Sequence, residues 1–516
     1  MSNSARKEFF IILLCLFIGF VLRFYTFDQK SLWGDEVYTF NDSRDNLNGQ
    51  IKYYKENSTF LHPPLFFILT HLFYPFEKPE RDLRIIPLIF GTLSIPMIYL
   101  LARLFSPSIA FPCALSLTFM TYHISLSQDG RSYSLLMFLG IIGLYFLMKH
   151  LQTNKKRYLF PVAFFFSLLF YTSYSSIPFI VISQILLVYQ ARGKGSKFHL
   201  SSFLILNGLI MLFCLPWISF ITVNYQGQPL MDLPFEKKVS LSFWNILYGI
   251  FHDWVPFAPL MFTSLITLIL FPIFSKCRRN AIILLAVFLI PVVGLFLFCI
   301  LFNITHFVTS RYFIILLPLF NISIYLSLNG IEDKFQRSRR YGRFTHLFLI
   351  LFIASNLLIL PLYYRSEKQD SRRLANYLKG EIRDGDKVIM GSLAYIPGIL
   401  HYFGVYPEGR QYIYSTRKIS ENEIEFRFFL SAHNDKFTIS YSDTYWRKYV
   451  TEGSRLWFVV DKTSAKKIKR DTPCVLKGYF DGSFANAERF PFDASLYLFL
   501  WDPKSPDQKG IDMTIE

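Results

Sequence analysis

Residues 9–36 read FFIILLCLFIGFVLRFYTFDQKSLWGDE, an apolar segment from Phe9 to Phe27 followed closely by the acid pair Asp35-Glu36. An apolar segment of this length is typical of a membrane-spanning helix. Two carboxylates at the mouth of such a helix are costly unless they have a task, and a desolvated carboxylate at a membrane surface suits a general base. The stretch therefore predicts a membrane protein whose chemistry lies at one end of its first helix.

Composition and charge extend this prediction to most of the chain. Hydrophobic residues make up 52% of the 516 residues, and long stretches without a charge recur up to residue 362. The net charge is +17, but from residue 363 onward 24 Lys and Arg face 21 Asp and Glu, so an excess of +14 lies in the short loops between apolar segments. This distribution is typical of the positive-inside rule and argues against a nucleic-acid partner.

The basic loops predict the topology. Arg6 and Lys7 place the N-terminus in the cytoplasm, and basic clusters at 155–157, 192–197, 276–279 and 334–343 fall on the same side if the chain crosses eleven times. The first helix is expected to be a span and not a cleaved signal peptide. The expected spans are 8–27, 85–104, 107–127, 133–150, 158–175, 177–191, 200–222, 256–275, 281–302, 312–329 and 344–362.

The segments outside these spans are expected to form an outer loop and an outer domain. The loop covers residues 28–84, and its apolar run from Pro63 to Pro75 is too short to cross the hydrocarbon core, so we expect a helix at the outer surface. Residues 1–362 form the membrane domain, and residues 363–516 form a small extracytoplasmic α/β domain. Helices are expected at 371–382 and 395–403, and strands at 386–390, 455–460 and 495–501. The domain is either a scaffold or a lid over the membrane cavity.

Polar features on the outer side are the candidate site. Neighbouring helical residues point about 100° apart, so one of Asp35 and Glu36 is expected to react while the other orients it or binds substrate. The alternative is an acid pair that the helix dipole favours by less than ~1 kcal/mol. In His62-Pro63-Pro64 the prolines begin a helix, and His62 either caps it or touches the site.

Three later loops add charge on the same side. Residues 127–133, SQDGRSY, contain either an exposed ion pair or a charged patch that lines a cavity. In residues 309–312, TSRY, the arginine either reaches for the interface or presents a planar fork of donors to a phosphate. The long outer loop 224–253, which contains Lys237, Lys238, His252 and Asp253, is expected to cover substrate or face a partner.

No P-loop, dinucleotide fingerprint or HExxH motif occurs, so a lipid-linked activated donor is favoured over a nucleotide-fed reaction. Taken in order, the motifs resemble the bacterial members of the GT-C membrane glycosyltransferases, the protein O-mannosyltransferase and lipid A aminoarabinose transferase superfamily, which is glycosyltransferase family 39-like. The motifs are Ser31-Leu32-Trp33-x-Asp35-Glu36, Leu61-His62-Pro63-Pro64-Leu65, Arg84-x-x-Pro87-x-x-x-Gly91, Ser127-Gln128-Asp129-x-Arg131-x-Tyr133, Ser310-Arg311-Tyr312 and Tyr363-Tyr364 followed by Arg373-x-x-x-Tyr377-Leu378.

The resemblance implies a polyprenyl-phosphate sugar donor and an inverting transfer to a hydroxyl at the outer face of a bacterial inner membrane. It implies that Asp35 is the catalytic base, supported by Glu36. Acceptor or sugar would be positioned by Glu36, His62 and Asp129, and the lipid phosphate by Arg131 and Arg311. The expected substrate- and donor-binding residues also include Gln128, Tyr133 and Tyr312. Relatives commonly carry Glu at the position of Asp129, so the reach of this carboxylate is shorter here.

The resemblance does not identify the acceptor, which is a glycan, a lipid or a protein. No cofactor is required by the sequence; His62 and Asp129 are able to share a divalent metal, but their spacing does not demand one. The alternative function is a transporter or flippase of lipid-linked sugars, for which charges near the middle of the membrane and an inverted repeat are expected. The charges cluster at one surface, which favours the enzyme.

Overall fold

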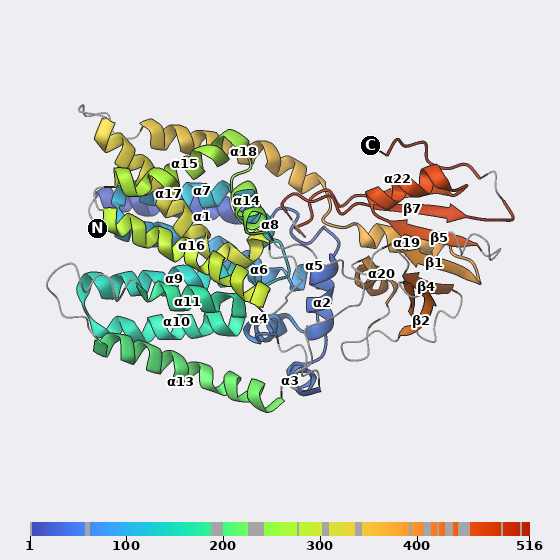
Figure 1. The fold of residues 1–516 in the computed structure, drawn as a ribbon, viewed down its shortest axis with the longest axis horizontal. Helices are drawn as coiled ribbons and strands as arrows, with labels where there is room; N and C mark the ends of the chain where they lie inside the picture. The colour runs from blue at the N-terminus through green and yellow to red at the C-terminus, as the bar shows by residue number, and fades with distance from the viewer. Residues whose placement is uncertain are drawn as a thin grey trace.

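The computed structural model shows a helical bundle joined to a smaller α/β domain, with the N-terminus at the end of the bundle that lies away from that domain (Figure 1). The structure describes residues 3–56, 62–185, 187, 200–224, 242–275, 278–301, 309–335, 343–391, 395–404, 406, 414–420, 423–428, 437–441, 455–486, 489–505 and 508–515. The predicted fold class, a helical membrane domain with a C-terminal α/β domain, is confirmed.

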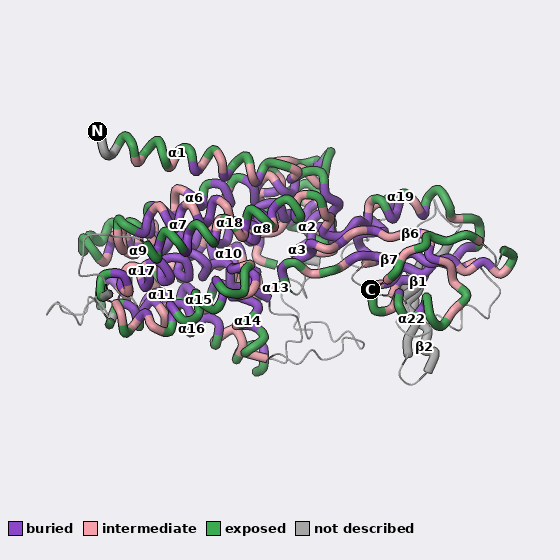
Figure 2. Tube along the Cα trace, turned by 90° about the horizontal axis from the view of Figure 1, so that it is seen from above, coloured by how far each residue is buried: buried purple, intermediate pink, exposed green. Residues whose placement is uncertain are grey.

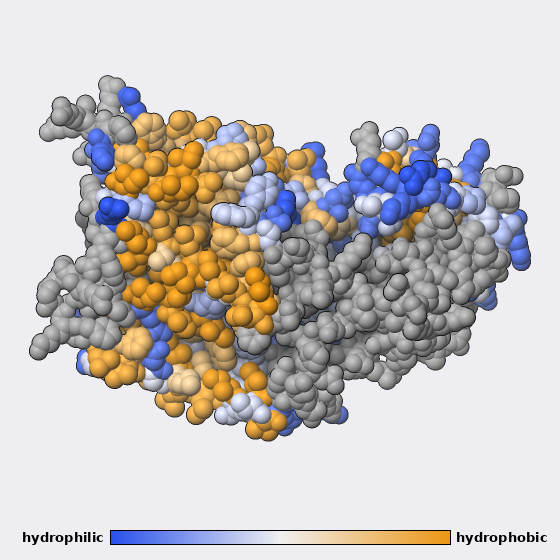
Figure 3. All heavy atoms as spheres, viewed as in Figure 1, coloured by the Kyte–Doolittle hydropathy of each residue, from blue (hydrophilic) through white to orange (hydrophobic). Residues whose placement is uncertain are grey.

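The helices of the bundle are apolar on both their inner and their outer sides. Their outward faces form a broad hydrophobic surface (Figure 3), while the inner faces are buried (Figure 2). A helix that is apolar all round is typical of a membrane span. The bundle comprises α1 (Asn3–Phe24), α6 (Ile85–Phe105), α7 (Pro107–Phe119), α8 (Thr121–Ser127), α9 (Tyr133–Thr153), α10 (Leu159–Thr172), α11 (Ile177–Ser183), α13 (Leu200–Asn224), α14 (Phe243–Trp254), α15 (Ala258–Phe274), α16 (Arg278–Leu301), the 3-10 helix η4 (Ser310–Leu316), α17 (Leu317–Phe335) and α18 (Arg343–Arg365).

The described residues contain fewer candidate membrane spans than the eleven expected. Within the described residues, six helices are long and apolar enough to cross a membrane, and two bent pairs raise the number to at most eight. The expected first span forms the 22-residue helix α1, but it contains Glu8 and Arg23 and is not among the six. The expected fifth and sixth spans contain the shorter helices α10 and α11. Eleven spans therefore stay a prediction. The basic cluster at 192–197 lies outside the described residues, as does most of the cluster at 334–343.

The expected span 107–127 is broken, which corrects the prediction of a single helix. α7 and α8 meet at 61° because Met120 adopts an extended backbone. The break exposes the backbone N–H of Thr121, which donates to Oδ1 of Asn356 on α18 at 2.8 Å, while the Thr121 hydroxyl donates to the carbonyl of Asn356. A kink in a membrane helix persists only where a neighbouring helix satisfies the freed groups, as Asn356 does here.

The expected outer loop 224–253 also needs correction. Its last part is the helix α14, which meets α15 at 117°. Asp253 in α14 is buried, so it does not face solvent as a loop residue would. Lys237 and Lys238 lie outside the described residues.

The first outer loop forms short helices, as predicted. They are α2 (Gly34–Ser43), α3 (Leu47–Glu56), α4 (Leu65–Thr70), the 3-10 helix η1 (His71–Phe73) and α5 (Pro79–Asp82). They lie between the bundle and the α/β domain (Figure 1). α4 and η1 together fill the run from Pro63 to Pro75 and are too short to span a membrane.

The α/β domain contains a mixed seven-stranded sheet in the order β2-β3-β4-β1-β5-β7-β6, with β1 parallel to β4 and β5 and the other neighbours antiparallel. Residues of β1, β5 and β7 alternate between two hydrophobic cores, one shared with α19 and α20 and the other with α22. Both faces are therefore covered, which explains apolar strands without alternation. The elements are α19 (Ser371–Glu381), β1 (Asp386–Met390), α20 (Ile396–Phe403), β2 (Tyr414–Ser420), β3 (Glu423–Phe428), β4 (Phe437–Tyr441), β5 (Leu456–Val460), α22 (Lys462–Asp471), β6 (Val475–Phe480) and β7 (Leu496–Trp501).

Candidate active site

The acid pair opens α2, and its two carboxylates face different surroundings. Glu36 is fully buried and accepts both arms of the Arg84 guanidinium, at 2.7 Å from Nε and 2.6 Å from Nη2. The backbone N–H of Gly130 adds a third hydrogen bond at 2.7 Å. Burial disfavours the charge, but Arg84 and then Lys368 outweigh it and lower the pKa of Glu36 to about 2. Glu36 is thus a fixed anion that joins the first outer loop to the start of α6.

Asp35 points away from this pair. Its side chain is 31% exposed, and its Oδ2 accepts a hydrogen bond from Nη1 of Arg311 at 2.9 Å, across 276 positions of sequence. The Arg311 guanidinium is stacked among aromatic rings, 5.2 Å from the Trp33 ring, 5.7 Å from Tyr312 and 5.9 Å from Tyr133. Among the residues described, Nε of Arg311 has no acceptor. The arginine therefore holds Asp35 with Nη1, while its Nε is buried and unpaired among the described residues.

A cavity of about 510 Å³ lies beside Arg311, which is one of its lining residues; Asp35 and Glu36 do not line it themselves. Its charged residues come from two of the predicted motifs and His62 from a third, while residues 172–175 add further hydroxyl groups. Other walls are apolar residues of α11 and α16, among them Pro178, Leu295 and Phe298. Such a combination fits a ligand with an anionic head and an apolar body. The predicted site residues that line it are His62, Arg131, Tyr133, Arg311 and Tyr312.

Arg131 connects the cavity with α2. Its Nη1 donates to the Thr39 hydroxyl at 3.0 Å and to the Asp35 carbonyl at 3.3 Å. Burial opposes its charge, yet Tyr133 and Asp35 raise the pKa of Arg131, so it carries a permanent positive charge at the cavity wall. Two arginines thus face one cavity from separate loops.

Gln128 and Asp129, also predicted to bind substrate, do not line the cavity. Gln128 donates from Nε2 to the carbonyls of Arg23 and Tyr25 and accepts from the Tyr363 hydroxyl. Asp129 accepts from the indole N–H of Trp33 at 2.9 Å, and burial raises the pKa of this carboxyl against the pull of Lys368. Both side chains face inward because the second expected outer loop, residues 127–133 (hereafter the second outer loop), contacts the first, residues 28–84.

Sequence reasoning missed two cations that hold this buried network. Arg84 was recognised only as part of a motif, although a charge just ahead of an apolar span was the available signal. Lys368, between α18 and α19, lies 3.6 Å from Asp129 and 4.0 Å from Glu36, and no local pattern marks it.

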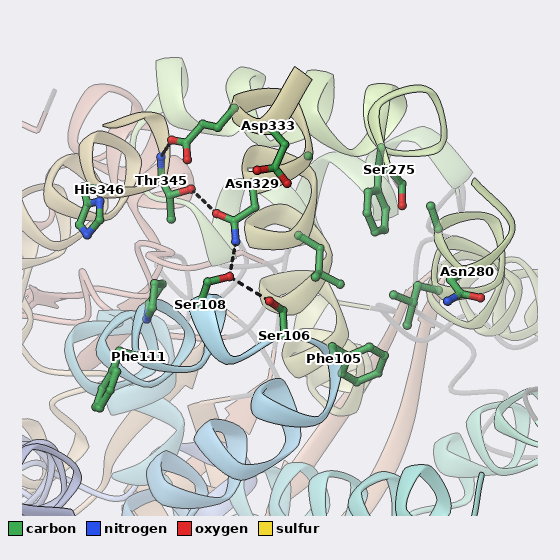
Figure 4. Close-up of a pocket in the computed structure, with 17 residues that line it drawn as sticks. Phe105, Ser106, Ser108, Phe111, Ser275, Asn280, Asn329, Asp333, Thr345 and His346 are labelled. Carbon is green, nitrogen blue, oxygen red and sulfur yellow. Dashed lines mark hydrogen bonds between the residues drawn. The ribbon is translucent and has the colours of Figure 1, made fainter. Parts of the chain in front are cut away.

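A larger cavity, of about 640 Å³, lies at other helix ends, those of α6, α15 and α17, and contains none of the predicted site residues (Figure 4). One wall is a chain of hydrogen bonds that runs from Ser106 through Ser108, Asn329 and Thr345 to Glu332. Its polar atoms serve the packing of α7, α17 and α18, so size does not make it the candidate site. In the part of the chain that the structure describes, no three His, Cys, Asp or Glu side chains group as metal ligands.

Comparison with known proteins bears on the fold. Over residues 61–220, less than a third of the chain, the sequence matches the family model described as dolichyl-phosphate-mannose-protein mannosyltransferase. The structure matches ArnT from Cupriavidus metallidurans bound to undecaprenyl phosphate, with a TM-score of 0.53 and 12% identity over 95% of this chain and 97% of that chain. The chain has the ArnT fold. The apo state of ArnT matches with the same TM-score and 10% identity over 96% and 98% of the two chains.

These matches support the resemblance inferred from the motifs. The region that matches the family model begins just before His62 and includes Arg84 and the second outer loop. The match to ArnT extends over both the bundle and the α/β domain. No curated protein matches the chain.

Proposed function

We propose that this chain is a membrane glycosyltransferase that moves a sugar from a polyprenyl-phosphate donor to an acceptor hydroxyl at the outer face of the membrane, with inversion at the anomeric carbon. The observation that carries the proposal is the ion pair between the partly exposed Asp35 and the buried Arg311, which lines a cavity with apolar walls. It provides a candidate base and a candidate phosphate ligand within one hydrogen bond of each other. The ArnT fold, seen in a protein with undecaprenyl phosphate bound, supports the donor class.

The donor phosphate would bind the two arginines. Arg311 and Arg131 line the same cavity, Arg311 from η4 and Arg131 from the loop at residues 127–133. A planar guanidinium is the side chain best matched to phosphate oxygens. The apolar residues of α11 and α16 would take the first isoprene units, because they line the same cavity as the arginines.

Asp35 would accept the proton of the acceptor. Phosphate binding to Arg311 replaces the carboxylate as its partner and frees Oδ2 for an acceptor hydroxyl. The hydroxyl oxygen then attacks the anomeric carbon on the side opposite the phosphate, the bond from that carbon to the phosphate oxygen breaks, and polyprenyl phosphate leaves. The proton passes to Asp35, and the configuration inverts. His62, Tyr133 and Tyr312 line the space that the sugar would occupy.

The decisive variant is Asp35→Asn, which keeps the shape and removes the base. The acceptor is first identified by mass spectrometry of envelope glycans, lipids and proteins from wild-type and deletion strains. We expect Asp35→Asn to reduce the transfer at least ~100-fold, the usual scale for loss of a general base. Asp28→Asn, which changes an exposed acid in the same outer loop, is the control and should transfer normally.

Donor binding separates chemistry from affinity. Asp35→Asn should still bind undecaprenyl phosphate, because its arginines are intact. Full transfer by Asp35→Asn would exclude the base assignment, and loss of undecaprenyl phosphate binding in this variant would show that Asp35 serves the donor instead.

A further inference from the structure

Lys368 is a buried cation that the proposed mechanism does not use. It lies in the short segment between α18 and α19, where the chain leaves the bundle for the α/β domain, and its side chain is 2% exposed. Its Nζ donates to the Gln128 carbonyl at 2.9 Å and lies 3.6 Å from Oδ1 of Asp129. A buried ammonium is expensive unless carboxylates surround it, and here Asp129 and Glu36 do so.

The contacts of Asp129 lead from Lys368 to the candidate site. The same Oδ1 that faces Lys368 accepts the indole N–H of Trp33 at 2.9 Å. The Trp33 ring in turn lies 5.2 Å from the Arg311 guanidinium, which holds Asp35. Each step is a direct contact between side chains with little freedom, because Trp33, Asp129 and Lys368 are all buried.

Charge makes this path sensitive to Lys368. Asp129 shares its buried surroundings with Glu36, whose charge is fixed by Arg84. Without a nearby cation, two carboxylates in one buried site repel each other, and one of them takes up a proton or moves. Among the described residues, Oδ2 of Asp129 has no hydrogen-bond donor, so Lys368 and the Trp33 indole are what hold this carboxylate.

We infer that Lys368 is a positioning residue, which acts through Asp129 and Trp33 to fix Arg311 beside Asp35. The segment that leads into the α/β domain would then be part of the active site and not only a connection. The inference about Trp33 stands on the contacts alone; its consequence for the donor rests on the proposed function.

The α/β domain is also linked to the 3-10 helix that carries Arg311, through Asp253. The backbone N–H of Phe490 donates to Asp253 at 3.1 Å, and the neighbour of Arg311, Ser310, donates its hydroxyl to the same carboxylate. The Ser310 oxygen also pairs with the Tyr122 hydroxyl at 2.7 Å. The 3-10 helix that carries Arg311 is thus held by the contacts of Ser310 with Asp253 and Tyr122. A displaced Trp33 ring would therefore change the surroundings of the Arg311 guanidinium and would not move the whole helix.

The first test observes Trp33 directly. The full-length protein is labelled with 5-fluorotryptophan, and the ¹⁹F resonance of Trp33 is assigned with Trp33→Phe. Lys368→Met should shift this resonance, and Lys368→Arg should restore it because the positive charge returns. Lys30→Met is the matched control, since Lys30 is another buried lysine in this region that contacts Tyr363 and not Asp129.

The double variant distinguishes positioning from general loss of packing. The double variant Asp129→Asn with Lys368→Met removes both charges. The difference in Trp33 chemical shift between this double variant and Asp129→Asn alone should be smaller than the difference between Lys368→Met and the wild type. An unchanged Trp33 resonance in Lys368→Met, or an equal shift in Lys30→Met, would overturn the inference. If Lys368→Met does not fold, the Trp33 resonances of the double variant, of Asp129→Asn and of Lys368→Arg decide the inference about Lys368 in the same way.

The second test uses undecaprenyl phosphate as the probe. Lys368→Met should bind it about 10-fold more weakly than the wild type, a typical coupling between contacting groups, and the double variant should recover most of that loss. Equal affinity of wild type and Lys368→Met would overturn the positioning role. No binding by the wild type would instead contradict the proposed donor, and the Trp33 resonance would still decide the inference.

Discussion

At the scale of single residues, the two acids at the start of α2 have different tasks because neighbouring positions on a helix point about 100° apart. Glu36 is saturated by Arg84 and the Gly130 N–H and has no access to a cavity. Asp35, one position earlier, is partly exposed and shares a hydrogen bond with Arg311. A carboxylate whose oxygens are all occupied by hydrogen bonds cannot take a proton from a substrate. A carboxylate with a single hydrogen bond can exchange that bond for one to the substrate. This contrast is the physical reason to assign the base to Asp35.

Loss of Glu36 should therefore affect stability more than chemistry. Glu36→Gln leaves the buried Arg84 guanidinium without a counter-charge, which costs about 3 kcal/mol in comparable buried pairs. We expect a clearly lower midpoint of thermal unfolding in detergent. Glu77→Gln, which changes an exposed acid in the same loop, should unfold like the wild type. Equal midpoints for Glu36→Gln and the wild type would contradict the structural role.

The same carboxylate predicts an acid dependence. The pKa of Glu36 is lowered from 4.5 to about 2 in the folded protein, since Arg84 and Lys368 outweigh the effect of burial. The stability that the ionised carboxylate contributes is thus present above pH 4.5 and is lost as the pH falls from about 4.5 towards 2. The wild type should lose more thermal stability between pH 5 and pH 3 than Glu36→Gln does. Parallel losses in the two proteins would show that other groups govern the acid sensitivity.

At the scale of elements, the break between α7 and α8 carries the second outer loop to its place. α8 is short and leads directly into residues 128–131, so its direction decides where Asp129 and Arg131 lie. The break is held by Asn356 of α18, which accepts the Thr121 N–H and also accepts its hydroxyl. A helix that ran straight through Met120 would carry the loop elsewhere, so Asn356 contributes to the site from a distance.

Asn356→Leu should destabilise the protein and weaken the site. The Thr121 N–H would remain buried without an acceptor, at a cost of about 1–3 kcal/mol. We expect a lower thermal midpoint and weaker binding of undecaprenyl phosphate, measured on the same preparation. Leu358→Ala, on the exposed face of the same helix, is the matched control and should change neither quantity. Unaltered stability of Asn356→Leu would mean that the break does not depend on this contact.

At the scale of the whole molecule, the α/β domain is bonded to the loops that form the site. The Tyr402 hydroxyl of α20 accepts the N–H of Leu32 and donates to Glu80, and Glu367 accepts the N–H of Ser31. Ser31 and Leu32 lie a few residues before Asp35, and Glu80 lies near the other end of the same loop. The domain and the site are therefore expected on the same side of the membrane, and the N-terminus lies at the far end of the bundle (Figure 1).

This arrangement predicts which parts are reachable from outside. A tag after Glu516 should be accessible to an impermeant reagent in intact spheroplasts, whereas a tag before Met1 should be protected until the membrane is opened. The expectation follows from an odd number of spans with a cytoplasmic N-terminus. Protection of the C-terminal tag would contradict the eleven-span topology.

The sequence predicted the elements of the α/β domain where burial is two-sided or amphipathic. The strands β1, β5 and β7 were found within a residue because both of their faces are covered, which leaves an apolar run. α22, KTSAKKIKRD, was missed because charged residues dominate the segment and only Ala465 and Ile468 are buried. β2, β3, β4 and β6 were missed as well, since charged residues, other polar residues or a glycine interrupt the apolar run in each.

The sequence by itself determined that the chain spans a membrane repeatedly and that its polar outer loops hold acids, a histidine and arginines, because apolarity and charge are local properties of a segment. Only the tertiary structure decided that Arg311 and Arg131 share a cavity with His62, that Gln128 and Asp129 turn inward, and that Lys368 joins them. Asp35 meets Arg311 across 276 positions and Glu36 meets Arg84 across 48. Such pairings depend on how loops from separate helices pack, and no local pattern of residues records them.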